Sequence, residues 1–173
     1  MRSKAGPPIL GRVSIAVRAA EERDLPLLPG IERSADGMFG SVGIVFPPGP
    51  TVVEELIGGA AEIFVVGDPP VGFAAVSELD GGAYLEQIAL RAGHTGRGLG
   101  GVLLGRVLDV AAGPVTLLTF RDVRWNGPWY ARHGFAGFPA VEWGPGLRAH
   151  WQAEIDAGLH ALGPRLAMRH PGR

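Results

Sequence analysis

A glycine-rich stretch in the middle of the chain is the segment best suited to chemistry. Residues 94–101 read His-Thr-Gly-Arg-Gly-Leu-Gly-Gly and lie between an apolar strand-like run and an apolar helix-like run. Because glycine has no bulky side chain, the backbone amides of this stretch are accessible. Amides at the start of a helix bind phosphate, since the helix dipole and the free N–H groups both favour an anion. The stretch therefore predicts a site for a phosphorylated ligand.

From its own residues this stretch has several interpretations. Gly96, Gly98 and Gly101 satisfy the G-x-G-x-x-G pattern of dinucleotide-binding folds, and Asp122 follows the next strand, where a ribose-binding acid would lie. Against a Rossmann unit, several elements precede the loop, whereas such a unit usually begins with it. A Walker loop is excluded because no Lys follows the glycines. A glycine-rich turn without a ligand is a further alternative.

A second segment favours one interpretation. Residues 125–135 read Trp-Asn-Gly-Pro-Trp-Tyr-Ala-Arg-His-Gly-Phe. Together the two segments resemble the GNAT superfamily of acetyl-CoA-dependent N-acetyltransferases. In that family a strand leads into an Arg/Gln-x-x-Gly-x-Gly/Ala loop and a helix, and an Asn, a short helix with a Tyr and a Gly-Phe pair follow. The matching residues are Gly98, Gly100, Asn126, Tyr130, Gly134 and Phe135.

The resemblance covers residues 15–145, with two departures. Thr95 stands where the loop usually has Arg or Gln, and Ala92 stands where a Pro often follows the strand. Thr95 removes a side chain that helps to shape the loop, but it leaves the backbone amides that contact pyrophosphate.

The resemblance implies direct transfer of an acetyl group from acetyl-CoA to an amine, without a covalent enzyme intermediate. It assigns Glu86, on the strand before the loop, as the base and Tyr130 as the acid that protonates the departing thiolate. Main-chain atoms of the strand would pair with pantetheine, loop amides would hold the pyrophosphate, and Asn126 would hydrogen-bond the pantetheine arm. The residues expected to bind acetyl-CoA are Ile88, Ala89, Leu90, Thr95, Gly96, Arg97, Gly98, Leu99, Gly100, Gly101 and Asn126.

The acceptor pocket has weaker signals. Tryptophans would line it and acidic residues would attract a cationic amine, although Trp residues are usually core and acidic residues usually face water. The candidates are Trp125, Trp129, Trp143, Glu32, Asp36, Glu78 and Asp122.

The elements that must position these residues follow from periodicity and turn signals. We expect strands at residues 15–18, 62–66, 71–78, 83–90 and 115–120, with further strand pieces within 135–143. We expect helices at residues 21–31, 51–57, 99–112, 126–133 and 146–162, and a loop at 34–50. In the strand at 83–90 we expect Tyr84, Glu86 and Ile88 on one face and Leu85, Gln87 and Ala89 on the other, although a bulge could change the direction of Gln87. The predicted fold class is α/β (α+β), with a central mixed, mostly antiparallel sheet flanked by helices.

Composition limits the function classes. The chain has 173 residues, 46% hydrophobic and 19% charged, which predicts one folded domain over 1–173 with flexible ends at 1–12 and 164–173. The basic residues of the second end would be solvated. The formal net charge of −1 gives no general attraction to nucleic acid or an anionic membrane. No run is long enough for a transmembrane helix, and the absence of cysteine is compatible with the cytoplasm. The histidines show no metal-ligand spacing, so no metal is expected.

The sequence therefore predicts a cytoplasmic GNAT-fold N-acetyltransferase that acts on a primary amine of a small molecule or peptide. The resemblance implies a homodimer as one oligomeric state, which the residues leave open. A non-catalytic acyl-CoA-binding module of the same fold is the first alternative. An NAD(P)-binding Rossmann domain is the second.

Overall fold

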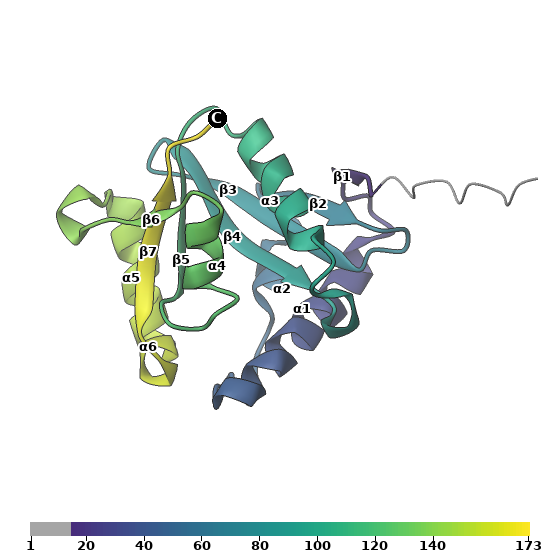
Figure 1. The fold of residues 1–173 in the computed structure, drawn as a ribbon, viewed down its shortest axis with the longest axis horizontal. Coiled ribbons are helices and arrows are strands. Elements are labelled where there is room, and N and C mark those ends of the chain that lie inside the picture. The colour runs from purple at the N-terminus through teal and green to yellow at the C-terminus, as the bar shows by residue number, and fades with distance from the viewer. Residues whose placement is uncertain (1–14) are drawn as a thin grey trace, which may run out of the picture.

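A mixed sheet of seven strands forms the centre of the computed structural model, which describes residues 15–173 (Figure 1). The strand order is β1-β2-β3-β4-β5-β7-β6, and every neighbouring pair is antiparallel except the parallel pair β4–β5. The strands are β1 (Val17–Ala19), β2 (Glu62–Val66), β3 (Gly72–Leu79), β4 (Gly82–Leu90), β5 (Val115–Phe120), β6 (Ala136–Gly137) and β7 (Arg165–His170). The predicted fold class is confirmed.

Helices cover both faces of the sheet (Figure 1). They are α1 (Leu28–Gly37), α2 (Val52–Leu56), α3 (Leu99–Val110), α4 (Gly127–Arg132), α5 (Pro145–Asp156) and α6 (Leu159–Leu162). Short 3-10 turns are η1 (Leu25–Leu27), η2 (Met38–Val42), η3 (Ala92–His94) and η4 (Ala140–Glu142). Helices α3 and α4 pack on one face, where Leu103 and Tyr130 share a core with Leu117 of β5. Helices α1, α2 and α5 pack on the other face.

The largest core lies between α3 and the sheet. Helix α3 buries Leu99, Leu103, Leu104, Val107 and Leu108 along one stripe, whereas Val102 and Val110 are exposed. Leu103 has no exposed surface and packs within a cluster that includes strand residues of β2, β3, β4 and β5. A helix with so wide an apolar stripe is stable only when it is packed against other elements.

Leu103→Ala should therefore lower the free energy of unfolding by about 2–5 kcal/mol, because it leaves a cavity in this core. Val141→Ala is the control: Val141 is 87% exposed, and its truncation should change stability by less than about 0.5 kcal/mol. Denaturant unfolding measures both. Equal effects of the two truncations would contradict the core assignment.

A β-bulge in β4 corrects the expected alternation. Ala75 pairs with Gln87, but the next residue of β3, Val76, pairs with Leu85, so Glu86 has no partner opposite it. An extra residue of this kind reverses the direction of the side chains beyond it. Leu85 and Ile88 therefore both pack toward the α3 core. The prediction that Tyr84, Glu86 and Ile88 share one face is wrong for this reason.

The C-terminal segment is also corrected. Residues 164–173 were expected to form a flexible, solvated end, but Arg165–His170 form β7, which pairs with both β5 and β6. Two of its residues, Ala167 and Met168, are buried on opposite faces of the sheet. Apolar burial on both faces and continuous pairing with β5 stabilise a strand here although the segment is rich in arginine. The charges of Arg165 and Arg169 are compensated by ion pairs. The other expected flexible end, 1–12, lies outside the described residues.

Other boundaries differ less. Helix α1 continues into the predicted loop at 34–50, and η2 follows it. The strand pieces predicted within 135–143 reduce to the short β6. The helix predicted at 146–162 is divided into α5 and α6 at Gly158, which has a φ of 81°. The capping box of α2 is present: the Thr51 side chain accepts from the Glu54 amide, and the Glu54 carboxylate accepts from the Thr51 amide.

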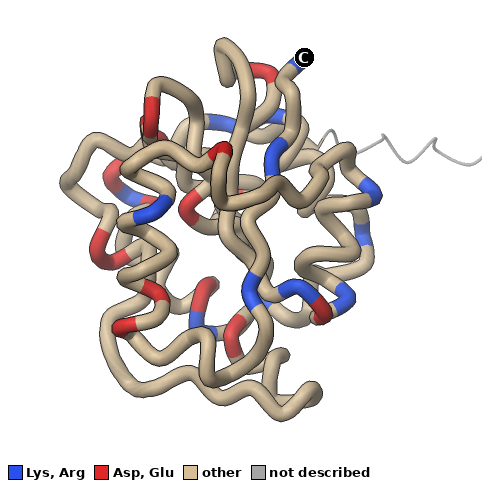
Figure 2. The backbone as a smooth tube through the Cα atoms, turned by 90° about the vertical axis from the view of Figure 1, so that its left-hand side faces the viewer, with Lys and Arg blue, Asp and Glu red and all other residues tan. Residues whose placement is uncertain are grey.

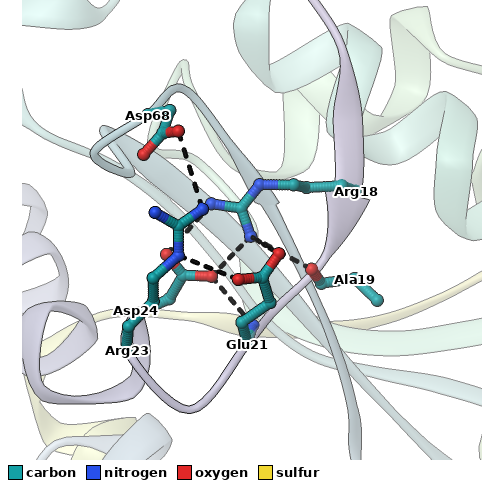
Figure 3. Close-up of polar contacts among 6 residues, drawn as sticks. All are labelled: Arg18, Ala19, Glu21, Arg23, Asp24 and Asp68. Carbon is teal, nitrogen blue, oxygen red and sulfur yellow. Dashed lines mark hydrogen bonds and ion pairs between the residues drawn. The ribbon is translucent and has the colours of Figure 1, made fainter.

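An ion-pair cluster joins β1 to the first helical turns and to the β2–β3 turn (Figure 3). Arg18 donates to both carboxylate oxygens of the buried Asp24, at 2.5 Å and 3.0 Å, and the Glu21 amide donates to the same carboxylate at 2.8 Å. These bonds, the Arg18 bond above all, lower the pKa of Asp24 to about 2. Arg23 extends the cluster to Asp68 at 3.6 Å.

This pKa predicts a pH-dependent effect of Asp24→Asn. The Asp24 carboxylate stabilises the fold above its ordinary pKa of 3.8, and the contribution disappears as pH falls toward about 2. Asp24→Asn should lower the Tm by a few degrees at pH 7, and the difference should close between these two pH values. Glu62→Gln on the exposed start of β2 controls for net charge. A Tm difference that persists unchanged at the lowest pH would contradict the linkage.

Charges of both signs are interspersed along the backbone rather than gathered by sign (Figure 2). Within residues 15–173, no helix has both the length and the hydropathy needed to cross a membrane.

Candidate functional site

The two parallel strands at the centre of the sheet separate soon after they begin. Strand β4 pairs with β5 only through Ala83 with Val115 and Tyr84 with Thr116. Beyond these positions a cleft of about 1290 Å³ is lined by β4, by the end of β5 and by helices from both faces of the sheet. An opening through the sheet therefore lets groups from its two faces approach one point.

The glycine-rich loop lies at the end of β4 and lines this cleft. Gly96 and Gly98 have φ values of 75° and 79°, in the left-handed region that favours glycine. Gly98 is the N-cap of α3, with no side-chain capping bond. Within residues 15–173, the amides of 95–101 donate no hydrogen bond, whereas the Val102 amide bonds to the Gly98 carbonyl. Free amides at the start of a helix are groups that can bind an anion.

Gly100 allows Trp129 of α4 to approach this loop closely. A Cβ at Gly100 would lie 3.2 Å from the Trp129 ring. Thr95, which replaces the usual Arg or Gln, is exposed, and its hydroxyl donates to the Ala92 carbonyl at 3.1 Å. Thr95 therefore closes the preceding turn by a local bond, without a long side chain.

The edge of β4 that faces the cleft carries a displaceable hydrogen bond. The Ile88 amide donates to the Gln87 side chain at 3.0 Å, and Gln87 in turn donates to Glu32 of α1 at 3.1 Å. The structure thus places residues 88–90 at an edge that β5 does not cover. Such an edge can bind an extended ligand through main-chain atoms once Gln87 moves aside.

Tyr130 and Asn126 come from α4 and its N-terminus. The Tyr130 ring is buried between Trp129 and Phe135, and burial raises the pKa of its hydroxyl above the ordinary value of 10.0. The hydroxyl therefore stays protonated at neutral pH. The Asn126 Oδ1 atom is buried without a hydrogen-bond partner in the described chain, and its side chain does not cap α4. Both residues line the cleft and leave polar atoms for a ligand.

Glu86 occupies the bulge of β4 and lines the same cleft, with its side chain 15% exposed. His150 of α5 is its neighbour, with Nε2 at 3.9 Å from Oε1 of Glu86. The other ring nitrogen of His150, Nδ1, lies 3.1 Å from the Gly146 carbonyl. This histidine has no motif around it in the sequence. Its approach to Glu86 depends on how α5 packs, so sequence reasoning missed it.

Carboxylates fix the helices that border the cleft. The buried Glu32 accepts the Val52 and Val53 amides at 2.8 Å and 2.9 Å, which anchors the N-terminus of α2 to α1. Asp80, in the β3–β4 turn, accepts the Gly146 and Leu147 amides at 2.7 Å and 2.8 Å, which anchors the N-terminus of α5. Negative charge at a helix N-terminus is favourable because of the dipole and the free amides.

Some of the acidic and aromatic residues predicted to line the acceptor pocket lie in the cleft, and others lie elsewhere in the fold. Trp125, Trp129, Glu32 and Asp36 line the cleft. Trp143 does not, because it packs against Phe138 and Trp151 and donates to the Phe138 carbonyl. Glu78 is exposed on β3, and Asp122 pairs with Arg121 beside a smaller pocket. Cleft residues that the sequence did not indicate are Phe39, Ile44, Phe46, Phe120, Glu154 and Arg165.

No group of three or more acidic or histidine side chains among residues 15–173 is placed to hold a metal ion.

The acetyltransferase (GNAT) family model matches residues 46–135. This match includes β4, the glycine loop and α4, and the chain belongs to this family.

Solved structures show the same fold. The ribosomal-protein-S18-alanine N-acetyltransferase from Escherichia coli has a TM-score of 0.63 and 19% identity, and the match covers 90% of this chain and 92% of that one. The PaiA N-acetyltransferase from Thermoplasma acidophilum, solved with coenzyme A, has a TM-score of 0.62 and 14% identity, over 92% and 99% of the two chains. N-acetylglutamate synthase from Neisseria gonorrhoeae, solved with coenzyme A and N-acetyl-glutamate, has a TM-score of 0.64 and 16% identity. That match covers 94% of this chain but only 36% of the synthase.

The left-handed backbone of the glycine loop gives a binding prediction. Alanine at Gly98 disfavours that conformation by about 1–2 kcal/mol. The free loop of Gly98→Ala should relax, and ligand binding must then restore its shape. We expect the Kd for coenzyme A, measured by calorimetry, to rise by about 5–30-fold. Gly113→Ala, beyond the other end of α3 with open space around it, should leave the Kd unchanged. Equal Kd values for the two variants would contradict the role of the loop.

Proposed function

We propose that this protein is an N-acetyltransferase that moves the acetyl group of acetyl-CoA to a primary amine of a small molecule or peptide. The observation that carries this proposal is the position of three features on one cleft: the free amides of residues 95–101, the Tyr130 hydroxyl and the Glu86 carboxylate. Family membership and solved relatives with coenzyme A support the choice of acetyl donor.

The donor would lie along β4. Amides of residues 96–101 hold the pyrophosphate, and Arg97 adds positive charge beside it. Main-chain atoms of Ile88, Ala89 and Leu90 pair with the pantetheine arm, and the buried Asn126 Oδ1 accepts a pantetheine amide N–H. Leu99 and Gly101 contribute amides at the first turn of α3. The loop amides and the Asn126 Oδ1 atom have no hydrogen-bond partner among residues 15–173, and the Ile88 amide is held by a side chain alone.

The reaction needs a proton acceptor and a proton donor. An alkyl amine, with a pKa of about 10.4, is mostly protonated at neutral pH. Glu86 accepts its proton, directly or through water, and the free amine attacks the thioester carbonyl. A C–N bond forms, the C–S bond breaks, and the thiolate takes a proton from the Tyr130 hydroxyl. The second proton, which the new amide nitrogen loses, returns to Tyr130, and Glu86 releases its proton to solvent. The raised pKa of Tyr130 keeps that proton available.

Tyr130→Phe tests the acid. It removes one oxygen and keeps the ring packing, so the Kd for coenzyme A should stay within about twofold. The kcat should fall by about 100-fold or more, the usual contribution of a positioned acid. Unchanged turnover would remove Tyr130 from the mechanism.

Glu86→Gln tests the base through pH. Its kcat/KM should fall by about 100-fold at pH 7, and the loss should shrink as pH approaches the pKa of the amine. Near that pH the substrate no longer needs a base. Glu62→Gln, away from the cleft, is the matched control. A loss that does not depend on pH would indicate a structural role for Glu86.

The alternatives can be separated. A Rossmann domain is overturned by the sheet, because β4, the strand before the glycine loop, is antiparallel to β3. A non-catalytic acyl-CoA-binding module predicts coenzyme A binding without turnover on any amine. Calorimetry with coenzyme A, followed by an acetyl-CoA turnover screen over amines, distinguishes that module from an enzyme.

A further inference from the structure

Aromatic rings form one wall of the cleft. Phe39 lies 5.2 Å from Phe46, 5.7 Å from Phe120 and 5.4 Å from Trp125, measured between ring centroids. These four residues, which we call the aromatic wall, come from η2, the following loop, β5 and the segment after it. All four line the cleft, with Ile44 among them. Rings grouped in this way favour an apolar, flat partner.

An unpaired carboxylate lines the cleft one helical turn before this wall. Asp36 is half-buried and makes no hydrogen bond or ion pair with any of residues 15–173. Burial, together with the nearby Glu32 charge, raises the pKa of Asp36 to about 6. Glu32 itself is fully engaged by the α2 amides and Gln87. A cation beside Asp36 would offset the unfavourable burial of its negative charge. This part of the cleft is therefore electrostatically suited to an ammonium group.

The arginines that line the cleft on this side are already paired or exposed. Arg165 makes two bonds to Glu154, at 2.9 Å and 2.6 Å, and stacks on Phe120. Arg33 donates to Glu54 at 2.8 Å. Arg124 is exposed and lies 5.9 Å from the centre of the Trp125 ring. Arg132, which also lines the cleft, is exposed as well, so no arginine of the cleft within residues 15–173 is both buried and unpaired. A carboxylate carried into the cleft beside the amine would therefore meet Asp36 without a buried guanidinium to pair with.

We propose that the acceptor is a small arylalkylamine: a primary amine joined by a short chain to an aromatic ring, with no carboxylate next to the nitrogen. The ring packs on the aromatic wall, Asp36 binds the ammonium group as it enters, and Glu86 takes its proton. This inference rests on the proposed acetyltransferase activity and assigns Asp36 as a specificity-determining residue. The reaction is the same transfer, in which a C–N bond forms and the C–S bond breaks.

The test compares four acceptors at saturating acetyl-CoA: 2-phenylethylamine, n-butylamine, phenylalanine and phenylalanine amide. We expect the kcat/KM for 2-phenylethylamine to exceed those for n-butylamine and phenylalanine by about tenfold or more. n-Butylamine lacks the ring, and phenylalanine adds a carboxylate that would have no partner. A preference for phenylalanine would overturn the proposal. A preference for phenylalanine amide would overturn the small-molecule assignment in favour of a peptide N-terminus.

Asp36→Asn should raise the KM for 2-phenylethylamine by about tenfold and leave the Kd for coenzyme A unchanged. Asp109→Asn, on the exposed face of α3 and outside the cleft, is the matched control and should change neither value. An unchanged KM in Asp36→Asn would overturn the role of Asp36.

Calorimetry tests the acceptor class separately from the proposed acetyltransferase activity. Failure to bind coenzyme A contradicts the acetyltransferase proposal. If coenzyme A binds but no amine is acetylated, titration of the four acceptors into the coenzyme A complex still decides the ligand class. Tightest binding of 2-phenylethylamine supports the inference, and any other order overturns it.

Discussion

The divergence of β4 from β5 is the constraint on which the rest of the site depends. In a continuous sheet the central strands would satisfy each other's backbone groups, and no ligand could reach them. Here the parallel ladder ends after Tyr84, and the bulge at Glu86 follows immediately. The separation leaves an uncovered strand edge, and the bulge places a carboxylate beside it. One local irregularity therefore provides both a binding edge and a candidate base.

The two sides of the opening have different physical character. On the side of α3 and α4, the available groups are backbone amides and a protonated hydroxyl, which suit an anionic donor and its departing thiolate. On the side of α1, α2 and α5, they are carboxylates and aromatic rings, which suit a cation. Glu32 and Asp80 hold the walls of this second side by capping helices from other elements. The geometry of the acceptor side is therefore fixed by buried charge as well as by apolar packing.

Local signals predicted what depends on local structure. The helices predicted at 51–57 and 99–112 and the glycine-rich loop depend on neighbours within a few residues, and α2 and α3 lie within the expected ranges. Three features depend on distant pairing. Glu86 and Gln87 are adjacent polar residues in an apolar strand, which indicates an irregular strand. Their spacing alone does not predict at which residue the bulge occurs. Residues 165–170 become a strand only because β5 offers an edge, and the approach of His150 to Glu86 depends on how Asp80 seats α5.

The carboxylates then divide by whether the fold satisfies them. Asp24, Glu32, Asp80 and Glu154 each accept two or more hydrogen bonds, so their charges are used to hold elements together. Glu86 and Asp36 lie in the cleft without such bonds; Glu86 has only His150 at 3.9 Å, and Asp36 has no partner among residues 15–173. Leaving a partly buried carboxylate without a compensating bond is unfavourable, and folds usually avoid it unless a ligand supplies the partner. By the same reasoning, the carboxylates with satisfied bonds serve the structure, and these two are the ones left to pair with the amine that we propose as the acceptor.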